Sequence, residues 1–282
     1  MKKVNIFLIL FLLISFFNCN SKENKKHDQS DKLSILVSIL PQYEFVKKVG
    51  GDKVSINVMI PPGAVPENYE PLPNQLKQIY TSDIYVKVGS PLPFEQSWIG
   101  KIKDLNENIK FIDMSKDVSI SDNDPHIWLS LRLAQKEIEN ILSGLCEISP
   151  KNCAYFKDNA SKYIQDLNSL DDNLKELFIT TKNKSFLVFH PSWAYLASDY
   201  GLKQVAIEKH GHEPLADDIM NIINWSKTNN IKFVFISPEF DKKHAEVISK
   251  EINAKLVEID PLAKNYLENI KEVSQKIYES LK

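Results

Sequence analysis

Short apolar runs alternate along the chain with segments whose apolar residues recur every three or four positions. From Leu33 onward, four apolar runs in each half of the chain fit β-strands. The runs are residues 33–40, 54–60, 83–89, 109–115, 185–190, 204–208, 231–237 and 255–260. Several of them, such as Phe233–Ile236, are apolar throughout, which is typical of strands buried on both faces of a parallel sheet. Because helical patterns fall between the runs, the sequence predicts an α/β protein of two lobes, each with a four-stranded mainly parallel sheet and flanking helices.

One long segment between the two halves has a different pattern. From Phe156 to Leu177 apolar residues recur at spacings of three and four, and no Gly or Pro interrupts them. Ser149 and Pro150 suit a helix start, as the N-cap and the first helical residue. The pattern predicts one rigid helix of about 30 residues that joins the lobes, roughly 45 Å long at about 1.5 Å per residue, with a coiled-coil arm as the alternative. We expect the N-terminal lobe at 33–148, the linking helix at 149–182 and the C-terminal lobe at 183–282.

The first residues fit an export signal rather than part of the fold. Lys2 and Lys3 precede an apolar run at 4–17. This run is shorter than the roughly 20 residues of a transmembrane helix, so a signal peptide at 1–18 is expected, with a short uncleaved anchor as the alternative. Residues 20–31 are almost wholly polar, which predicts a flexible tether at 19–32.

Cys19 lies two residues beyond the apolar run. This arrangement resembles a bacterial lipoprotein signal, in which such a cysteine becomes the lipidated first residue. Phe16 and Asn18 stand where these signals usually carry Leu and a small residue. The resemblance implies a membrane-anchored lipoprotein, with Cys19 as the lipidation site.

The composition excludes two classes of function. Lys and Arg number 35 against 37 Asp and Glu, so the chain lacks the basic excess of a nucleic-acid-binding protein. Only 8 glycines occur, and no glycine-rich phosphate-binding motif is present.

Beyond Cys19 there are two cysteines, Cys146 and Cys153, which an exported location permits to form a disulfide. Two separate thiols are the alternative.

Four candidate metal ligands share one kind of position. His126, His190 and Asp260 follow predicted strands, and Glu67 lies in the loop after the second strand. Open α/β sheets bind ligands outside the carboxyl ends of their strands. Each residue alone also fits a turn, a helix cap or a hydrogen-bonded core position, and for Glu67 the alternative is a cap on the helix that begins near 71–73. Their shared position strengthens the case for a metal site, with two candidate ligands in each lobe.

Five motifs support a more specific interpretation. In chain order they are PPGAVPENYEP (61–71), DPHIWL (124–129), FHPSWAYLASDYGL (189–202), EP (213–214) and IDPLA (259–263). Together they resemble the metal-binding receptors of ABC transporters for zinc and manganese, the periplasmic solute-binding protein family 9, from about Leu33 to the C-terminus. The resemblance implies two α/β lobes joined by a long helix, with a single metal ion in the cleft.

The resemblance also assigns roles to the candidate ligands. The second, third and fourth ligands of the family fall on His126, His190 and Asp260, while Glu67 stands where the family usually has histidine. Histidine at the third position is similar to the zinc members, so Zn²⁺ is expected as the transported ion. Manganese is the alternative, because two imidazoles and two carboxylates also equal the donor set of the manganese type. His210 and His212 are expected in a loop outside the direct ligand set.

The expected function is that of an extracytoplasmic receptor, not an enzyme. The resemblance implies a monomer that captures a divalent ion and delivers it to an ABC transporter permease, while acylated Cys19 holds it to the lipid bilayer. A metallohydrolase is the alternative of another class, but such a site keeps an open position for water, whereas four candidate ligands close the shell here. A surface adhesin is a further alternative, since some members of the family are described that way.

Overall fold

The computed structural model describes residues 32–208 and 214–282. The predicted signal peptide, the tether up to residue 31, Cys19 and the pair His210 and His212 lie outside the described residues. Within the described chain no helix is both long and apolar enough to cross a membrane.

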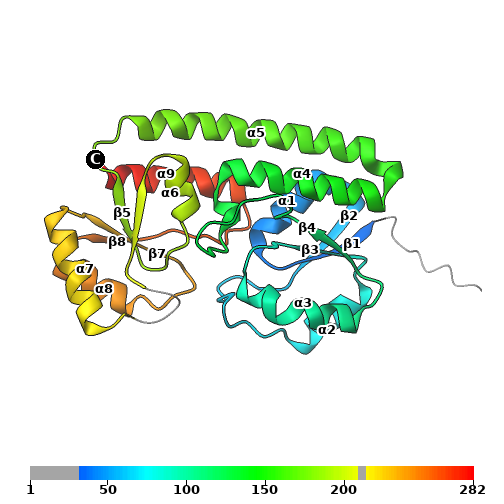
Figure 1. Cartoon of the computed structure of the whole chain (residues 1–282), viewed down its shortest axis with the longest axis horizontal. Helices are drawn as coiled ribbons and strands as arrows, with labels where there is room; N and C mark the ends of the chain where they lie inside the picture. Colours follow the sequence, from blue (N-terminus) through cyan, green and yellow to red (C-terminus); the bar gives the residue numbers. More distant parts are fainter. Residues whose placement is uncertain (1–31, 209–213) are drawn as a thin grey trace, which may run out of the picture. The chain divides into compact units, whose positions relative to one another are not determined.

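The N-terminal lobe is built on a parallel four-stranded sheet with the order β2-β1-β3-β4. Its strands are β1 (Leu33–Val37), β2 (Val54–Val58), β3 (Ile84–Lys87) and β4 (Lys110–Asp113). Its helices are α1 (Leu40–Gly50), α2 (Pro73–Thr81) and α3 (Pro93–Leu105), with a 3₁₀ turn at Gly51–Lys53. Because parallel strands need crossover connections, helices lie on both sides of this sheet, with α2 and α3 opposite α1 (Figure 1).

The C-terminal lobe repeats this topology with the order β6-β5-β7-β8, again all parallel. Its strands are β5 (Ser185–Val188), β6 (Lys203–Ala206), β7 (Phe233–Ile236) and β8 (Lys255–Glu258). Its helices are α6 (Ala194–Asp199), α7 (Ala216–Thr228), α8 (Lys243–Glu251) and α9 (Tyr266–Ser280). The predicted fold class is confirmed: all eight predicted strands are present, although each is shorter than its apolar run.

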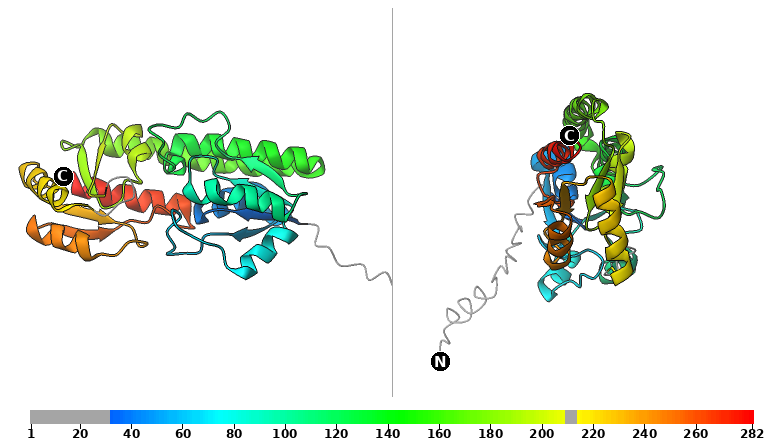
Figure 2. Two further views of the ribbon diagram at one scale, coloured as in Figure 1. Left: turned by 60° about the horizontal axis from the view of Figure 1, so that its bottom comes forward. Right: turned by 90° about the vertical axis from the view of Figure 1, so that its left-hand side faces the viewer.

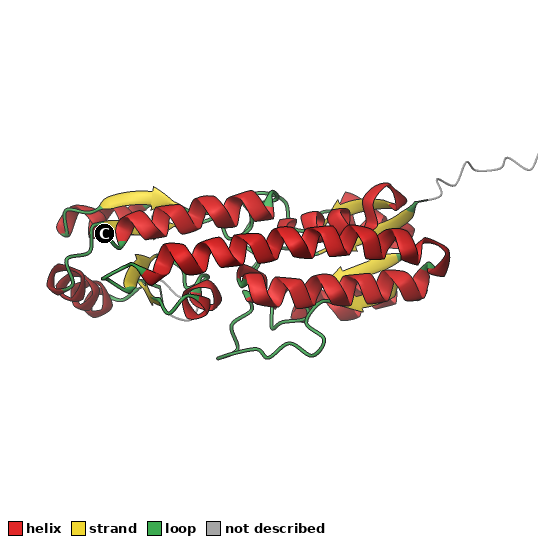
Figure 3. Cartoon of the chain, turned by 90° about the horizontal axis from the view of Figure 1, so that it is seen from above, coloured by secondary structure: helices red, strands yellow, loops and turns green. Residues whose placement is uncertain are grey.

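One long helix joins the lobes, and it follows a second long helix that packs on the first lobe. The 3₁₀ turn Ile127–Leu129 leads into α4 (Leu131–Ile148), whose N-cap Ser130 accepts a hydrogen bond from the Leu133 N–H. After α4 comes α5 (Cys153–Ile179), which packs on α4 and α1 of the first lobe and on α9 of the second. Figures 2 and 3 show α5 running alongside both α4 and α9. The eight buried positions of α5 include most of the apolar stripe seen in the sequence.

The start of α5 differs from the prediction. Pro150–Asn152 forms a 3₁₀ turn, and the α-helix begins only at Cys153. The Ser149 hydroxyl accepts a hydrogen bond from the Asn152 side chain (2.9 Å) instead of capping backbone N–H groups. Cys146 and Cys153 form a disulfide, which joins the last turn of α4 to the first turn of α5.

A buried polar network fixes the carboxyl end of the first sheet. Glu95, near the start of α3, accepts hydrogen bonds from the backbone N–H groups of Val88 (2.6 Å) and Gly89 (2.9 Å), just beyond β3. It also accepts one from the Ser38 hydroxyl beyond β1, and this hydroxyl lies 2.7 Å from the Tyr85 hydroxyl. The network holds the ends of the two central strands together.

Hydrogen bonds between buried groups join the two halves of the chain beside the linking helices. The Trp128 indole N–H donates to the Pro261 carbonyl (2.8 Å), and the Tyr266 hydroxyl donates to the Trp128 carbonyl (2.6 Å). Trp128 and Tyr266 are both almost completely buried. These bonds place the loop after β4 against the loop after β8, next to the carboxyl ends of both sheets.

Candidate metal centre

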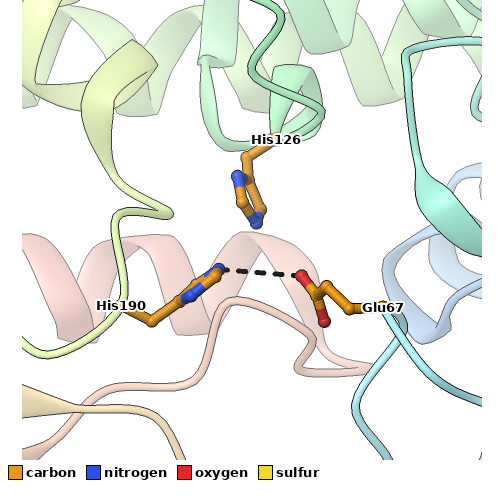
Figure 4. Close-up of side chains that lie close together, drawn as sticks. All are labelled: Glu67, His126 and His190. Atoms are coloured by element: carbon orange, nitrogen blue, oxygen red, sulfur yellow. Dashed lines mark ion pairs between the residues drawn. The ribbon is translucent and has the colours of Figure 1, made fainter. Parts of the chain in front are cut away.

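Three of the four predicted ligands converge in the structure. Glu67 lies in the loop after β2, His126 directly precedes the 3₁₀ turn Ile127–Leu129, and His190 lies two residues beyond β5. One ligand atom from each lies within 4.8 Å of those of the other two. His190 Nε2 is 3.7 Å from Glu67 Oε1. Figure 4 shows the three side chains pointing toward one another from three separate loops.

Each histidine is oriented by its own carboxylate. Asp124 Oδ1 lies 2.6 Å from His126 Nδ1, and Glu208 Oε2 lies 2.7 Å from His190 Nδ1. Because Nδ1 of both rings is engaged, Nε2 remains for a metal ion. A carboxylate behind a ligating imidazole fixes the ring and makes it a stronger donor. The two acids that sequence reasoning missed, Asp124 and Glu208, therefore prepare both histidines for metal binding.

The three converging residues line a small cavity with largely apolar walls. The cavity measures about 20 Å³ and is lined among others by Leu92, Trp128 and Phe240. The Phe240 ring stacks on the His190 ring with centroids 4.8 Å apart. Glu67 Oε2 is buried without a hydrogen-bond partner among the described residues. An unpaired buried carboxylate oxygen is costly, and a cation in the cavity would satisfy it.

The structure does not place Glu67 as a helix cap. Helix α2 begins at Pro73 with Leu72 as its N-cap, five residues beyond Glu67. The short contact of Glu67 is with His190 of the other lobe. The geometry therefore favours a Glu67 that faces the metal site over a Glu67 that caps helix α2.

Asp260 lies beside this group rather than in it. It is not one of the three residues whose ligand atoms converge. Asp260 borders a neighbouring cavity of about 250 Å³, and its Oδ1 accepts a hydrogen bond from the Leu262 N–H (2.7 Å). Burial raises the pKa of Asp260, while the Leu262 N–H and a hydrogen bond with Glu239 lower it.

Glu239 is an acid at the site that sequence reasoning missed. It lies three residues beyond β7 and lines the cavity of Glu67, His126 and His190. Burial raises its pKa to about 7, and its Oε2 is buried without a partner among the described residues. The signal was present in the sequence, because Ser237-Pro-Glu239 follows an apolar strand just as His190 and Asp260 do.

Two parallel α/β lobes, a long helix that joins them and metal-ligating side chains at the strand ends define a metal-binding solute-binding protein. The chain belongs to the ZnuA family, described as zinc-uptake complex component A, periplasmic, which matches residues 35–280. The resemblance read from the five motifs is thereby confirmed.

Individual relatives agree with this assignment. The high-affinity zinc uptake system protein ZnuA of Bacillus subtilis (strain 168) is 28% identical over 268 residues, which is 87% of this chain and 83% of that protein. The zinc-binding lipoprotein AdcA of Streptococcus pneumoniae (strain R6) is 30% identical over 286 residues, 93% of this chain and 56% of AdcA, so the chain spans about half of AdcA. A crystal structure of a ZnuA deletion mutant with zinc bound is 37% identical with a TM-score of 0.85, covering 89% of this chain and 98% of that one.

Proposed function

We propose that this protein is an extracytoplasmic receptor that binds one zinc ion between its lobes and delivers it to the permease of an ABC transporter. Acylated Cys19 anchors it to the membrane, and the receptor acts as a monomer. The observation that carries the proposal is the convergence of Glu67, His126 and His190 from both lobes, with each imidazole oriented by a carboxylate.

Zinc suits the donor set better than manganese. Two neutral imidazoles are strong ligands for Zn²⁺, whereas Mn²⁺ prefers carboxylate and water oxygen. The relatives named for zinc uptake and zinc binding support the same choice. Manganese remains the alternative to be tested, because an acid completes the site in either case.

Charge favours a second acid at the site. Glu67 balances one of the two positive charges of the ion, and a further carboxylate from the C-terminal lobe balances the other. Asp260 is the acid that the family resemblance assigns to this role. A neutral complex suits a cavity with apolar walls, since an unbalanced buried charge is costly.

Transport fits the cavity better than hydrolysis does. A hydrolytic zinc site needs an open position for water and space for a substrate beside it. The cavity of about 20 Å³ has room for one water-sized particle, which suits a bare ion better than an organic substrate. We therefore propose binding and release without catalysis.

Metal titration of the purified protein tests the proposal. His126→Ala and His190→Ala should each weaken zinc binding by more than about tenfold, because even the loss of an outer partner of a ligand costs that much. His244→Ala, in helix α8, is the matched control and should bind like wild type. Competition between Zn²⁺ and Mn²⁺ should favour zinc. Unchanged affinity in both site variants would refute the site, and preference for manganese would refute the choice of ion.

A further inference from the structure

The acid that completes the site from the C-terminal lobe is identified by the cavity that it lines. We propose that Glu239 supplies the fourth donor to the metal ion, and that Asp260 positions Glu239 rather than binding the ion itself. This inference rests on the proposed function and names a ligand that the family resemblance did not assign.

Glu239 shares the cavity of the three converging residues, and Asp260 does not. The walls of the cavity of about 20 Å³ include Glu67, His126, His190 and Glu239. Asp260 is not among the residues that line this cavity and instead borders the neighbouring cavity of about 250 Å³, which Glu239 also lines. Glu239 thus lines both the metal cavity and the cavity that Asp260 borders, and, like Asp260, it lies outside the three residues whose ligand atoms converge in the structure.

The hydrogen bonds of Glu239 and Asp260 also support Glu239 as the metal ligand. Asp260 Oδ1 is engaged by the Leu262 N–H at 2.7 Å. Glu239 Oε2 is buried and has no hydrogen-bond partner in the described chain, as is also true of Glu67 Oε2. Two acids that approach the same cavity from opposite lobes thus each keep a buried oxygen unpaired. One cation between them satisfies both oxygens, and its two positive charges are balanced by Glu67 and Glu239.

Asp260 is well placed to act through Glu239. The two side chains border the same cavity of about 250 Å³, and the Leu262 N–H fixes Asp260 by a hydrogen bond to its carboxylate. The Asp260 carbonyl also accepts a hydrogen bond from the Asn269 side chain of α9 (2.7 Å). A residue held at both its side chain and its backbone can keep Glu239 aimed at the ion.

Zinc titrations of the full protein compare three acids that line these two cavities. Glu239→Gln should weaken zinc binding by more than about tenfold, and Asp260→Asn should weaken it by less than Glu239→Gln does. Glu258→Gln is the matched control, because Glu258 lines the neighbouring cavity of about 250 Å³ and pairs with Lys242 at 3.0 Å, so the affinity of this variant should equal that of wild type. Thermal unfolding of the metal-free variants checks that each is folded.

Affinity alone does not separate a ligand from its positioning partner, because losing either costs about tenfold to a hundredfold. The visible spectrum of bound Co²⁺ separates the two roles, because it reports the donor set and geometry around the ion. Glu239→Gln should change this spectrum, whereas Asp260→Asn should weaken binding but keep the wild-type spectrum.

The possible outcomes separate this inference from the proposed function. If His126→Ala abolishes tight binding while Glu239→Gln binds like wild type, the site stands and the role of Glu239 is refuted. A changed Co²⁺ spectrum in Asp260→Asn with an unchanged one in Glu239→Gln would make Asp260 the ligand. If His126→Ala also binds like wild type, the proposed function fails first.

Discussion

Glu95, which is buried, and Glu239, which is half-buried, lie beyond corresponding strands of the two sheets and have opposite surroundings. Glu95 follows β3 and Glu239 follows β7, which occupy the same place in the two strand orders. Burial raises the pKa of each to about 7. The carboxylate of Glu95 accepts three hydrogen bonds from the fold around it, whereas Oε2 of Glu239 accepts none. A perturbed pKa therefore marks both acids equally, and only the hydrogen-bond partners distinguish a structural acid from one that is available to a ligand.

The histidines, in contrast, are treated alike in the two lobes. His126 of the first lobe and His190 of the second each have Nδ1 within 2.7 Å of a carboxylate oxygen. The two lobes thus orient their histidine ligands in the same way, whereas their acids have different surroundings. The first lobe uses Glu95 to hold its central strands and takes Glu67 from an edge-strand loop, while in the second lobe one buried oxygen of Glu239, the acid beyond the central strand, has no hydrogen-bond partner among the described residues.

The largest expected effect is on stability, and it separates the two glutamates. Glu95→Ala leaves the N–H groups of Val88 and Gly89 and the Ser38 hydroxyl without their acceptor, which should lower the free energy of unfolding by about 2–4 kcal/mol. Glu239→Ala should lower it by less than about 1 kcal/mol in metal-free protein, since no such donors depend on that side chain. Urea unfolding of both variants without metal measures the difference. Equal losses would show that the two acids have the same role.

A smaller effect tests whether the two histidines are oriented in the same way. Asp124→Asn and Glu208→Gln should each weaken zinc binding by about tenfold to a hundredfold, because each removes the charge behind a ligating imidazole. Calorimetric or competitive titration measures both affinities, with Glu258→Gln as the control. A loss in only one of the two variants would show that the lobes do not contribute equivalent histidines.

The smallest effect is the pH dependence that Glu239 gives to metal-free protein. Its pKa is raised from 4.5 to about 7 in the folded chain, so between these values the folded state holds a proton that the unfolded state has released. Stability should therefore fall as pH rises through this window, and Glu239 should account for about 1 kcal/mol of the fall after allowance for its partial exposure.

The raised pKa of Glu95 also makes stability fall as pH rises. The contribution of Glu239 is therefore measured by comparing wild type with Glu239→Gln. Unfolding free energies at about pH 4.5 and about pH 7 should differ less in Glu239→Gln than in wild type. An identical slope in the two proteins would place the Glu239 carboxylate in water rather than in the cavity.

Much of the site follows from the sequence because one physical rule applies to both lobes. The carboxyl ends of parallel strands meet at one edge of a sheet, so a residue that follows a strand is a candidate ligand. This rule found Glu67, His126 and His190, and the structure brings the three together. It also selected Asp260, which lies just outside the converging group.

The strand-end rule does not show which of several acids beyond the strands binds the metal ion. Glu239 lies three residues beyond β7 and Asp260 two beyond β8, and only side-chain packing shows which of them lines the cavity. Glu208 follows β6 and reaches His190 because β6 lies next to β5, a strand order that the apolar runs do not specify. The disulfide was likewise left open, because the approach of Cys146 to Cys153 depends on the angle between α4 and α5.

The size of the cavity has a consequence for how fast the ion is exchanged. A space of about 20 Å³ has room for one water-sized particle and not for an incoming chelator as well. A chelator cannot share this space with the ion, so we expect the ion to leave most of its protein ligands before a chelator binds it. The rate of extraction should then depend mainly on the protein and change little as chelator concentration rises. A partner that takes the ion faster than this rate has to act on the protein, by widening the cavity while the ion is still inside.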